Sequence, residues 1–186
     1  MYGTPLWTAV LVLREVRLKD GRTATIRHAV PTDADAAMEL TREVTAERVY
    51  VMTDRLVLTP EQVRQQLNDA DDRSEIYLVA EVEGSIVGEA SFRKGSYAKN
   101  AHTGDLWVVV RKDHRSRGVG EALLRTGIDW ARSAGIRKLK LRVFATNEVA
   151  QHLYRKLGFV EEARLGDEVM IDGRLVSDVL MALWLA

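Results

Sequence analysis

Two periodicities alternate along this chain: apolar residues at every second position, as in strands, and apolar residues three or four apart, as in helices. Leu139, Leu141 and Val143 alternate with basic residues and predict a strand with one face on a core. Leu40 and Val44 continue a helical stripe that begins with two alanines, after a cap at Thr32 or Asp33. The pattern predicts strands at 16–18, 23–28, 76–82, 85–92, 106–110, 138–144 and 179–185, a strand leading into a hairpin at 170–175, and helices after Thr32 and at 59–70, 121–134 and 147–157.

The predicted turns indicate how these strands pair. Asp20-Gly21, Glu83-Gly84 and Asp172-Gly173 each sit between strand-like runs, where glycine accepts the positive φ of a tight hairpin. Strands 106–110 and 138–144 are instead joined through a helix, which requires a parallel crossover. We therefore expect an α/β fold of the α+β kind, with one mixed, mostly antiparallel sheet of six to seven strands and helices on both faces. Because the segment LWVVV at 106–110 has no polar residue, we expect it to be a central strand covered on both faces.

No repeat or linker interrupts the 186 residues, so we expect one domain over 1–186, with an apolar extension at 1–13 and a core at 14–186. The apolar run Pro5 to Leu13 has nine residues and is too short to cross a bilayer. A secretory signal would need basic residues before its apolar run, but no Lys or Arg precedes Arg14. We expect a cytoplasmic protein in which this run is a strand-like segment or a homodimer interface, with a poorly ordered tail as the alternative.

Composition excludes several classes of protein. Hydrophobic residues at 46% and charged residues at 29% are typical of a globular chain and not of a disordered one. The 27 basic and 27 acidic residues cancel, so no nucleic-acid or membrane partner is expected. Without cysteine there is no disulfide, thiolate zinc site or cysteine nucleophile. The four histidines (His28, His102, His114 and His152) form no ligand cluster, and we expect no metal.

The segment Arg115-Ser116-Arg117-Gly118-Val119-Gly120 lies between a predicted strand and a predicted helix. A helix N-terminus offers unpaired N–H groups, glycines allow a ligand to approach the backbone, and arginines add charge. The segment therefore predicts a phosphate or pyrophosphate site, with a basic surface turn as the alternative. It has no Gly-Lys-Ser/Thr of a P-loop, and Leu123 stands where a dinucleotide fold needs Gly or Ala.

The pattern Arg115-x-x-Gly118-x-Gly120 resembles the signature of the GNAT-type acyl-CoA N-acyltransferases. The resemblance covers nearly the whole chain, including DGRTATIRHAVPTDADAAMEL, IYLVAEVEGSIVGEASF, DLWVVVRKDHRSRGVGEALL and ATNEVAQHLYRKLGFVEE. The terminal VMIDGRLVSDVLMAL is similar to the branch of bacterial amino-acid and phosphinothricin-type acetyltransferases.

This resemblance implies that acetyl-CoA is the acyl donor and assigns residues to it. In the family the glycine-bearing loop holds the pyrophosphate, the end of the preceding strand bonds the pantetheine arm through its backbone, and a bulge splays that strand to open a slot. The matching Asn contacts the cofactor. The residues implied are Val108, Val109, Val110, Arg115, Ser116, Arg117, Gly118, Val119, Gly120, Glu121 and Asn147.

Tyr154 is the candidate general acid. It shares a helical face with Ala150, Leu153 and Leu157, so it could equally be a core aromatic. A phenol stays protonated at neutral pH and can donate to a departing thiolate. The resemblance implies this role for the matching tyrosine.

The general base is less defined by the sequence, because several carboxylates could deprotonate the attacking amine. We favour Asp105, which precedes the strand that would present the thioester. His102 could share that role. The alternating Lys138, Lys140 and Arg142 are interpreted as a solvated face. The other candidate bases are Glu89, Glu43 and Glu47.

Together these features predict an acetyl-CoA-dependent N-acetyltransferase that acts on a small primary amine, such as an amino acid, by direct attack in a ternary complex. The alternatives are a protein N-terminal or lysine acetyltransferase and a non-catalytic acyl-CoA-binding domain. An amino-acid acceptor would need a positive group for its carboxylate. The candidates are Arg42, Arg48, Arg55 and Arg93.

Overall fold

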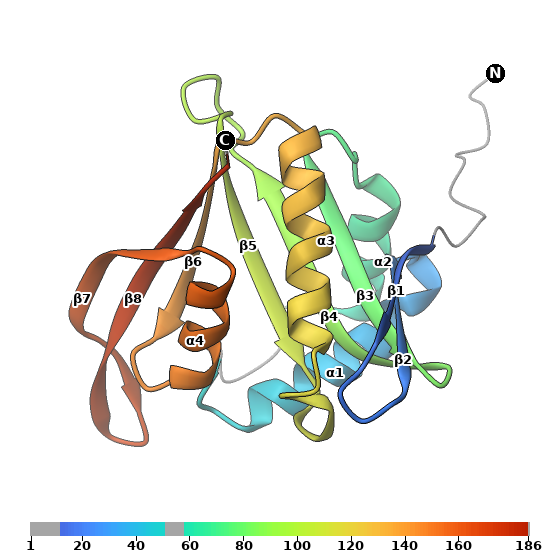
Figure 1. Cartoon of the computed structure of the whole chain (residues 1–186), viewed down its shortest axis with the longest axis horizontal. Coiled ribbons are helices and arrows are strands. Elements are labelled where there is room, and N and C mark those ends of the chain that lie inside the picture. The colour runs from blue at the N-terminus through green and yellow to red at the C-terminus, as the bar shows by residue number, and fades with distance from the viewer. Residues whose placement is uncertain (1–11, 51–57, 186) are drawn as a thin grey trace.

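A computed structural model describes residues 12–50 and 58–185 of the chain, which form eight strands, four α-helices and two short 3-10 turns (Figure 1). Most of the apolar run Pro5 to Leu13 therefore lies outside the described residues. The strands are β1 Val12–Arg17, β2 Thr23–His28, β3 Glu75–Val82, β4 Ser85–Lys94, β5 Thr103–Val110, β6 Lys138–Phe144, β7 Val160–Ile171 and β8 Arg174–Trp184. The helices are α1 Ala34–Ala46, α2 Pro60–Asp69, α3 Val119–Ser133 and α4 Glu148–Lys156, and the 3-10 turns are Pro31–Asp33 and Lys112–His114.

The described strands form one sheet in the order β1-β2-β3-β4-β5-β6-β8-β7. Neighbouring strands are antiparallel except β5 and β6, so the mixed, mostly antiparallel sheet is confirmed. The expected six to seven strands are corrected to eight. The edge strand β7 is mostly exposed and its pairing with β8 is irregular, which weakens its alternating signal in the sequence.

The parallel pairing of β5 and β6 is short. It joins Thr103 to Lys138, Gly104 to Leu139 and Asp105 to Lys140, and stops there. Beyond this point the two strands diverge, as Figure 1 shows from the top of the sheet downward. The sheet is thus split at its centre.

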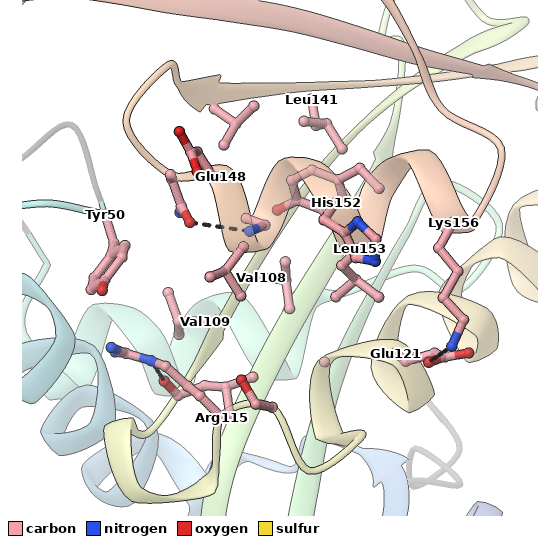
Figure 2. Close-up of a pocket in the computed structure, with 18 of the residues that line it drawn as sticks. Tyr50, Val108, Val109, Arg115, Glu121, Leu141, Glu148, His152, Leu153 and Lys156 are labelled. Atoms are coloured by element: carbon pink, nitrogen blue, oxygen red, sulfur yellow. Dashed lines mark hydrogen bonds and ion pairs between the residues drawn. The ribbon is translucent and has the colours of Figure 1, made fainter.

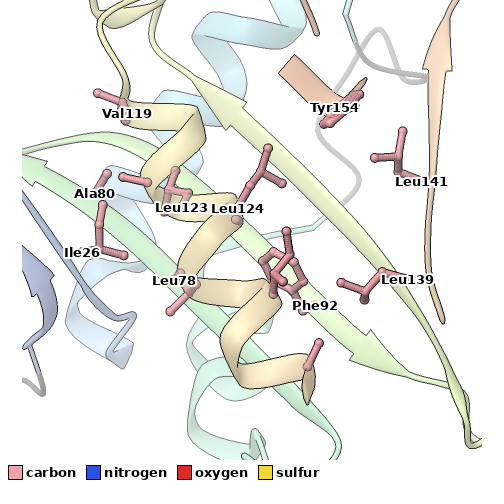
Figure 3. Close-up of a cluster of buried hydrophobic side chains, with 14 of the residues drawn as sticks. Ile26, Leu78, Ala80, Phe92, Val119, Leu123, Leu124, Leu139, Leu141 and Tyr154 are labelled. Carbon is pink, nitrogen blue, oxygen red and sulfur yellow. The ribbon is translucent and has the colours of Figure 1, made fainter. Parts of the chain in front are cut away.

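Helices cover both faces of the sheet, as expected (Figure 1). The main apolar cluster lies between α3 and the sheet, where Leu123 and Leu124 pack with Leu78 and Phe92 (Figure 3). A smaller cluster lies under α1 and contains Leu40, Val44, Val79, Ile86 and Val109. Together the two clusters hold the C-terminal end of β5 close to the N-terminal end of α3.

The predicted turns and caps are largely confirmed. Glu83 and Gly84 have φ of 50° and 78°, which is the conformation that a two-residue hairpin requires. Thr59 caps α2 by accepting from Gln62 N–H at 3.3 Å. Asp33 does not cap α1 with its side chain, because its carboxylate pairs with the Arg27 guanidinium at 2.7 and 2.9 Å.

Candidate active site

A pocket of about 680 Å³ opens where β5 and β6 diverge and extends to the start of α3 and along α4 (Figure 2). Its size is in the range of small-molecule and cofactor sites. It is lined by Lys19, Val44, Tyr50, Leu106, Trp107, Val108, Val109, Val110, Arg115, Ser116, Gly118, Gly120, Glu121, Leu141, Arg142, Val143, Thr146, Asn147, Glu148, Val149, Ala150, His152, Leu153, Tyr154 and Lys156.

The loop before α3, at 115–118, forms a cradle of open backbone N–H groups. Gly118 is the residue before the helix and has φ of 107°, and Ser116 has φ of 58°. Among the described residues nothing accepts from the N–H groups of Ser116, Arg117 and Gly118, and no side chain caps the first turn of α3. These donors and the positive end of the helix are suited to an anion. Helix α3 begins at Val119, two residues before the predicted start, so Gly120 belongs to its first turn.

The two arginines of this loop are both ion-paired within the protein. Arg115 donates to the Val110 carbonyl and to Glu47, each at 2.8 Å, and its guanidinium lies 4.5 Å from the centre of the Tyr50 ring. Arg117 donates to Asp20 at 2.6 Å and does not line the pocket. The uncompensated donors of the cradle are therefore backbone N–H groups, and Arg115 ties the end of β5 to α1.

Strand β5 exposes one edge to the pocket. Because its pairing with β6 ends at Asp105, the backbone groups that face β6 beyond this residue have no strand partner. The expected bulge is absent from the pairing with β4, which runs in register from Gly88–Val110 to Lys94–Gly104. The expectation that 106–110 is covered on both faces is corrected at Trp107, which is 38% exposed and lines the slot. Val109 is buried under α1, and Leu106, Val108 and Val110 pack against the main apolar cluster while also lining the pocket.

Tyr154 belongs to both the core and the pocket. Its ring packs on Phe159 with 5.8 Å between ring centres, and it lies beside Leu141 at the edge of the main cluster (Figure 3). No hydrogen bond to its hydroxyl is present among the described residues, and Tyr154 lines the pocket. Burial raises the pKa of Tyr154 to about 12, because the phenolate loses hydration. Tyr154 is thus a protonated, pocket-lining donor.

Three other residues assigned to the cofactor differ in their surroundings. Asn147 caps α4 by accepting from Ala150 N–H at 3.2 Å, and it lines the pocket. Glu121 also lines the pocket and binds Lys156 at 2.6 Å (Figure 2). Val119 is buried in the core and does not line the pocket.

The candidate bases lie in different surroundings. Asp105 is at the point where β5 and β6 part, 69% exposed and 3.3 Å from Lys140, and it does not line the pocket. Glu89 lies on β4 beside Val109 and accepts from the Thr41 hydroxyl. Burial raises the pKa of Glu89 to about 7, with the Thr41 bond acting in the opposite direction. The remaining two form ion pairs, Glu43 with Arg111 and Glu47 with Arg115.

None of the arginines proposed for an acceptor carboxylate lines the pocket in the part of the chain that the structure describes. Arg42 pairs with Glu39 and Arg93 with Glu75, while Arg55 lies outside the described residues. Sequence reasoning missed Tyr50, which follows α1, and Arg142, which it placed on a solvated face. Arg142 lines the pocket because β5 and β6 diverge, and the sequence carries no signal of that divergence.

Metal clusters and membrane-spanning helices are both absent from the described residues. No group of three or more His, Asp or Glu side chains is arranged to hold a metal ion there. In the same residues no helix combines the length and apolarity needed to span a membrane.

Comparison with known proteins identifies the family. L-amino acid N-acyltransferase MnaT from Escherichia coli is 34% identical over 109 residues, which cover 58% of this chain and 63% of MnaT. L-amino acid N-acetyltransferase AaaT from the same organism is 28% identical over 161 residues, or 84% of this chain and 95% of AaaT. The chain thus matches less than two thirds of MnaT but nearly all of AaaT.

A solved structure has the same architecture. The yncA structure from Salmonella typhimurium, solved with its cofactor acetyl-CoA, superposes with a TM-score of 0.80 at 26% identity and covers 88% of this chain and 94% of its own. A family model described as the acetyltransferase (GNAT) family matches residues 39–159. The resemblance seen in the loop before α3 is therefore confirmed, and the chain belongs to the GNAT acetyltransferase family.

Proposed function

We propose that this protein transfers the acetyl group of acetyl-CoA to the primary amine of a free amino acid or an amino-acid-like compound. The observation that carries the proposal is one continuous pocket that joins the open N–H cradle before α3 to the split between β5 and β6 and to the Tyr154 hydroxyl. The names of MnaT and AaaT, which specify L-amino acids, support this class of acceptor.

The protein's own groups suit each part of the acyl donor. The N–H groups around Gly118 and the first turn of α3 would hold the pyrophosphate. The unpaired edge of β5 at Val108 to Val110 would bond the pantetheine arm, and the Asn147 side chain would contact it at the start of α4. This placement brings the thioester between β5 and Tyr154.

The chemistry then needs one proton acceptor and one proton donor. The neutral amine attacks the thioester carbonyl carbon, the carbon–sulfur bond breaks, and the departing thiolate takes the proton of Tyr154. The surplus proton of the acylated nitrogen then passes through water to the Tyr154 phenolate, which restores the phenol. Before the attack, the ammonium form of the acceptor must lose a proton, and we assign Asp105 as the base that takes it. Asp105 lies where β5 and β6 separate, and its exposed carboxylate can pass the proton to water. No acyl-enzyme is required.

The two carboxyl groups near the opening have different expected roles. Asp105→Asn is expected to lower kcat/KM by roughly 10²-fold, the usual size of a general-base contribution. Glu89→Gln is expected to keep activity within a few-fold. If Glu89→Gln instead removes activity together with a kinetic pKa near 7, the proton acceptor is Glu89.

Glu89 is expected to make stability depend on pH. Its pKa of about 7 in the folded protein exceeds the ordinary 4.5, so the stability from its proton is complete below pH 4.5 and is lost as the pH rises through 7. The free energy of unfolding of Glu89→Gln, relative to that of wild type, should therefore increase as the pH rises from 4.5 to 7, by about 3 kcal/mol at most. Urea unfolding at several pH values measures the gain, and parallel curves for the two proteins would refute the buried, neutral carboxyl.

The acceptor class is tested by comparing a free amino acid with its C-terminal amide. We expect clear acetylation of the acid and a large drop in kcat/KM for the amide, because the site would hold the carboxylate while the amine loses its proton. Release of free thiol from acetyl-CoA measures both. Equal or better turnover of the amide or of peptides would favour a protein acetyltransferase, and binding without turnover of any amine would favour an acyl-CoA-binding domain.

We further propose that the protein is cytoplasmic and that it forms a homodimer. The apolar sequence from Pro5 to Leu13 supports the dimer. Sedimentation at micromolar concentration tests the assembly, and a monomer would contradict it.

A further inference from the structure

We propose that Arg142 binds the carboxylate of the acceptor and that the buried Asp178 holds its guanidinium in place. This inference rests on the proposed amino-acid acetyltransferase function and names the group that would select its acceptor. Arg142 lines the pocket from β6, the strand on the far side of the opening from β5.

The register of the two strands places Arg142 at the throat of the opening. Asp105 and Lys140 are the last paired residues and share one face of the sheet, as their 3.3 Å ion pair shows. The next residues on that face are Trp107 on β5 and Arg142 on β6, and both line the pocket. They belong to the face that also carries Val109 and α1. An amine that approaches from this face would pass between Trp107 and Arg142 and meet Asp105 beside them.

Asp178 orients the arginine. Its side chain is 1% exposed, and it accepts from Arg142 Nε. Among the described residues no other hydrogen bond to this carboxylate is present. A carboxylate withdrawn from water is costly unless it is paired, so the pair persists and fixes one edge of the planar guanidinium. Arg142 itself remains 45% exposed and lines the pocket.

The remaining donors of Arg142 are available to a ligand. Nη2 donates to Glu168 at 3.0 Å, whereas Nη1 has no partner among the described residues. Glu168 is 40% exposed and lies where the β7–β8 register breaks between Leu165 and Val169, so this contact can exchange. A ligand carboxylate could bind Nη1 and replace Glu168 on Nη2, which gives the two parallel bonds typical of arginine.

The other cations of this face are engaged in ion pairs. Lys140 pairs with Asp105 and Lys138 with Glu162, and neither lysine lines the pocket. Arg115 lines it, but both ends of its guanidinium are held by Glu47. Within the described residues, Arg142 is thus the pocket-lining arginine with a donor open to an acceptor.

The test measures acetylation and binding of an amino acid and of its amide. Arg142→Gln should raise KM for the acid about tenfold or more, as expected for losing a charge-assisted hydrogen bond, and leave KM for the amide and for acetyl-CoA unchanged. Glu168→Gln should lower KM for the acid several-fold, since it removes a competing carboxylate. Arg164→Gln is the matched control, because Arg164 forms a surface pair with Glu161 and does not line the pocket.

Two further measurements separate the possible failures. Because Arg142→Gln leaves Asp178 buried without its partner, the double variant Arg142→Gln/Asp178→Asn removes the stranded charge and should show the same selective loss. Calorimetry of the acid and the amide on the protein saturated with coenzyme A reports binding without turnover, and the acid should bind more tightly only where Arg142 is present.

Equal effects on acid and amide, or an unchanged preference for the acid in both Arg142 variants, would overturn the role of Arg142 while leaving the amino-acid function in place. Absence of both binding and acetylation of amino acids by the wild-type protein would overturn the proposed function, and the Arg142 site with it. Tighter binding of diamines than of amino acids, lost in Glu168→Gln, would assign this surface to a cationic acceptor.

Discussion

Tyr154→Phe is expected to lower kcat by roughly 10²-fold or more while leaving the affinity for acetyl-CoA unchanged. The substitution removes one hydroxyl and keeps the ring that packs on Phe159, so the fold should not change. Single-turnover measurements of acetyl transfer and calorimetric titration with coenzyme A give the two quantities.

The burial of Tyr154 also predicts a pH dependence. Since its pKa is about 12, the donor stays protonated through pH 10, and kcat should show no loss from tyrosine ionisation below that pH. Tyr77→Phe is a suitable control. Tyr77 is a half-buried tyrosine on β3 whose hydroxyl accepts a hydrogen bond from Arg93, and it does not line the pocket. Unchanged kcat in Tyr154→Phe, with chemistry limiting turnover, would make Tyr154 a core residue alone.

Gly120→Trp is expected to abolish binding of acetyl-CoA without unfolding the protein. Gly120 lies in the first turn of α3 and lines the pocket, so a large side chain there would occupy the space next to the free N–H groups. Calorimetry with coenzyme A and a thermal melt measure the two expectations.

Gly120→Ala supplies the matched control for this glycine. A Cβ at position 120 would lie 3.5 Å from Leu153 and 3.6 Å from Val110, which are ordinary contacts, so alanine should fold and bind with little change. Gly118 is less suitable, because its φ of 107° strains any other residue. If Gly120→Trp folds and binds coenzyme A normally, the loop does not hold the pyrophosphate.

The sequence alone determined the elements that carry local signals. Hairpins form at Glu83-Gly84 and Asp172-Gly173 because two residues with positive φ close each turn, and glycine supplies one of them at little cost. The capping pair of Thr59 and Gln62 starts α2 for a similarly local reason. The strand, loop and helix around Gly118 could also be predicted, because its residue types and their spacing are specific to the GNAT family.

Tertiary structure decided the features that depend on distant partners. The apolar segment at 106–110 has the same sequence signature whether it lies in a closed core or lines a slot, and only the divergence of β6 after Lys140 exposes it. The charge of Arg115 could be counted from the sequence, but its neutralisation by Glu47 depends on how α1 packs, 68 residues away. Arg142 alternates with lysines like any solvated position. It becomes a candidate site because it contacts Asp178 of β8 and lines the pocket between β5 and β6. Periodicity reports which face of an element is apolar, whereas burial, pairing and pocket shape follow from contacts between segments that the sequence does not place together.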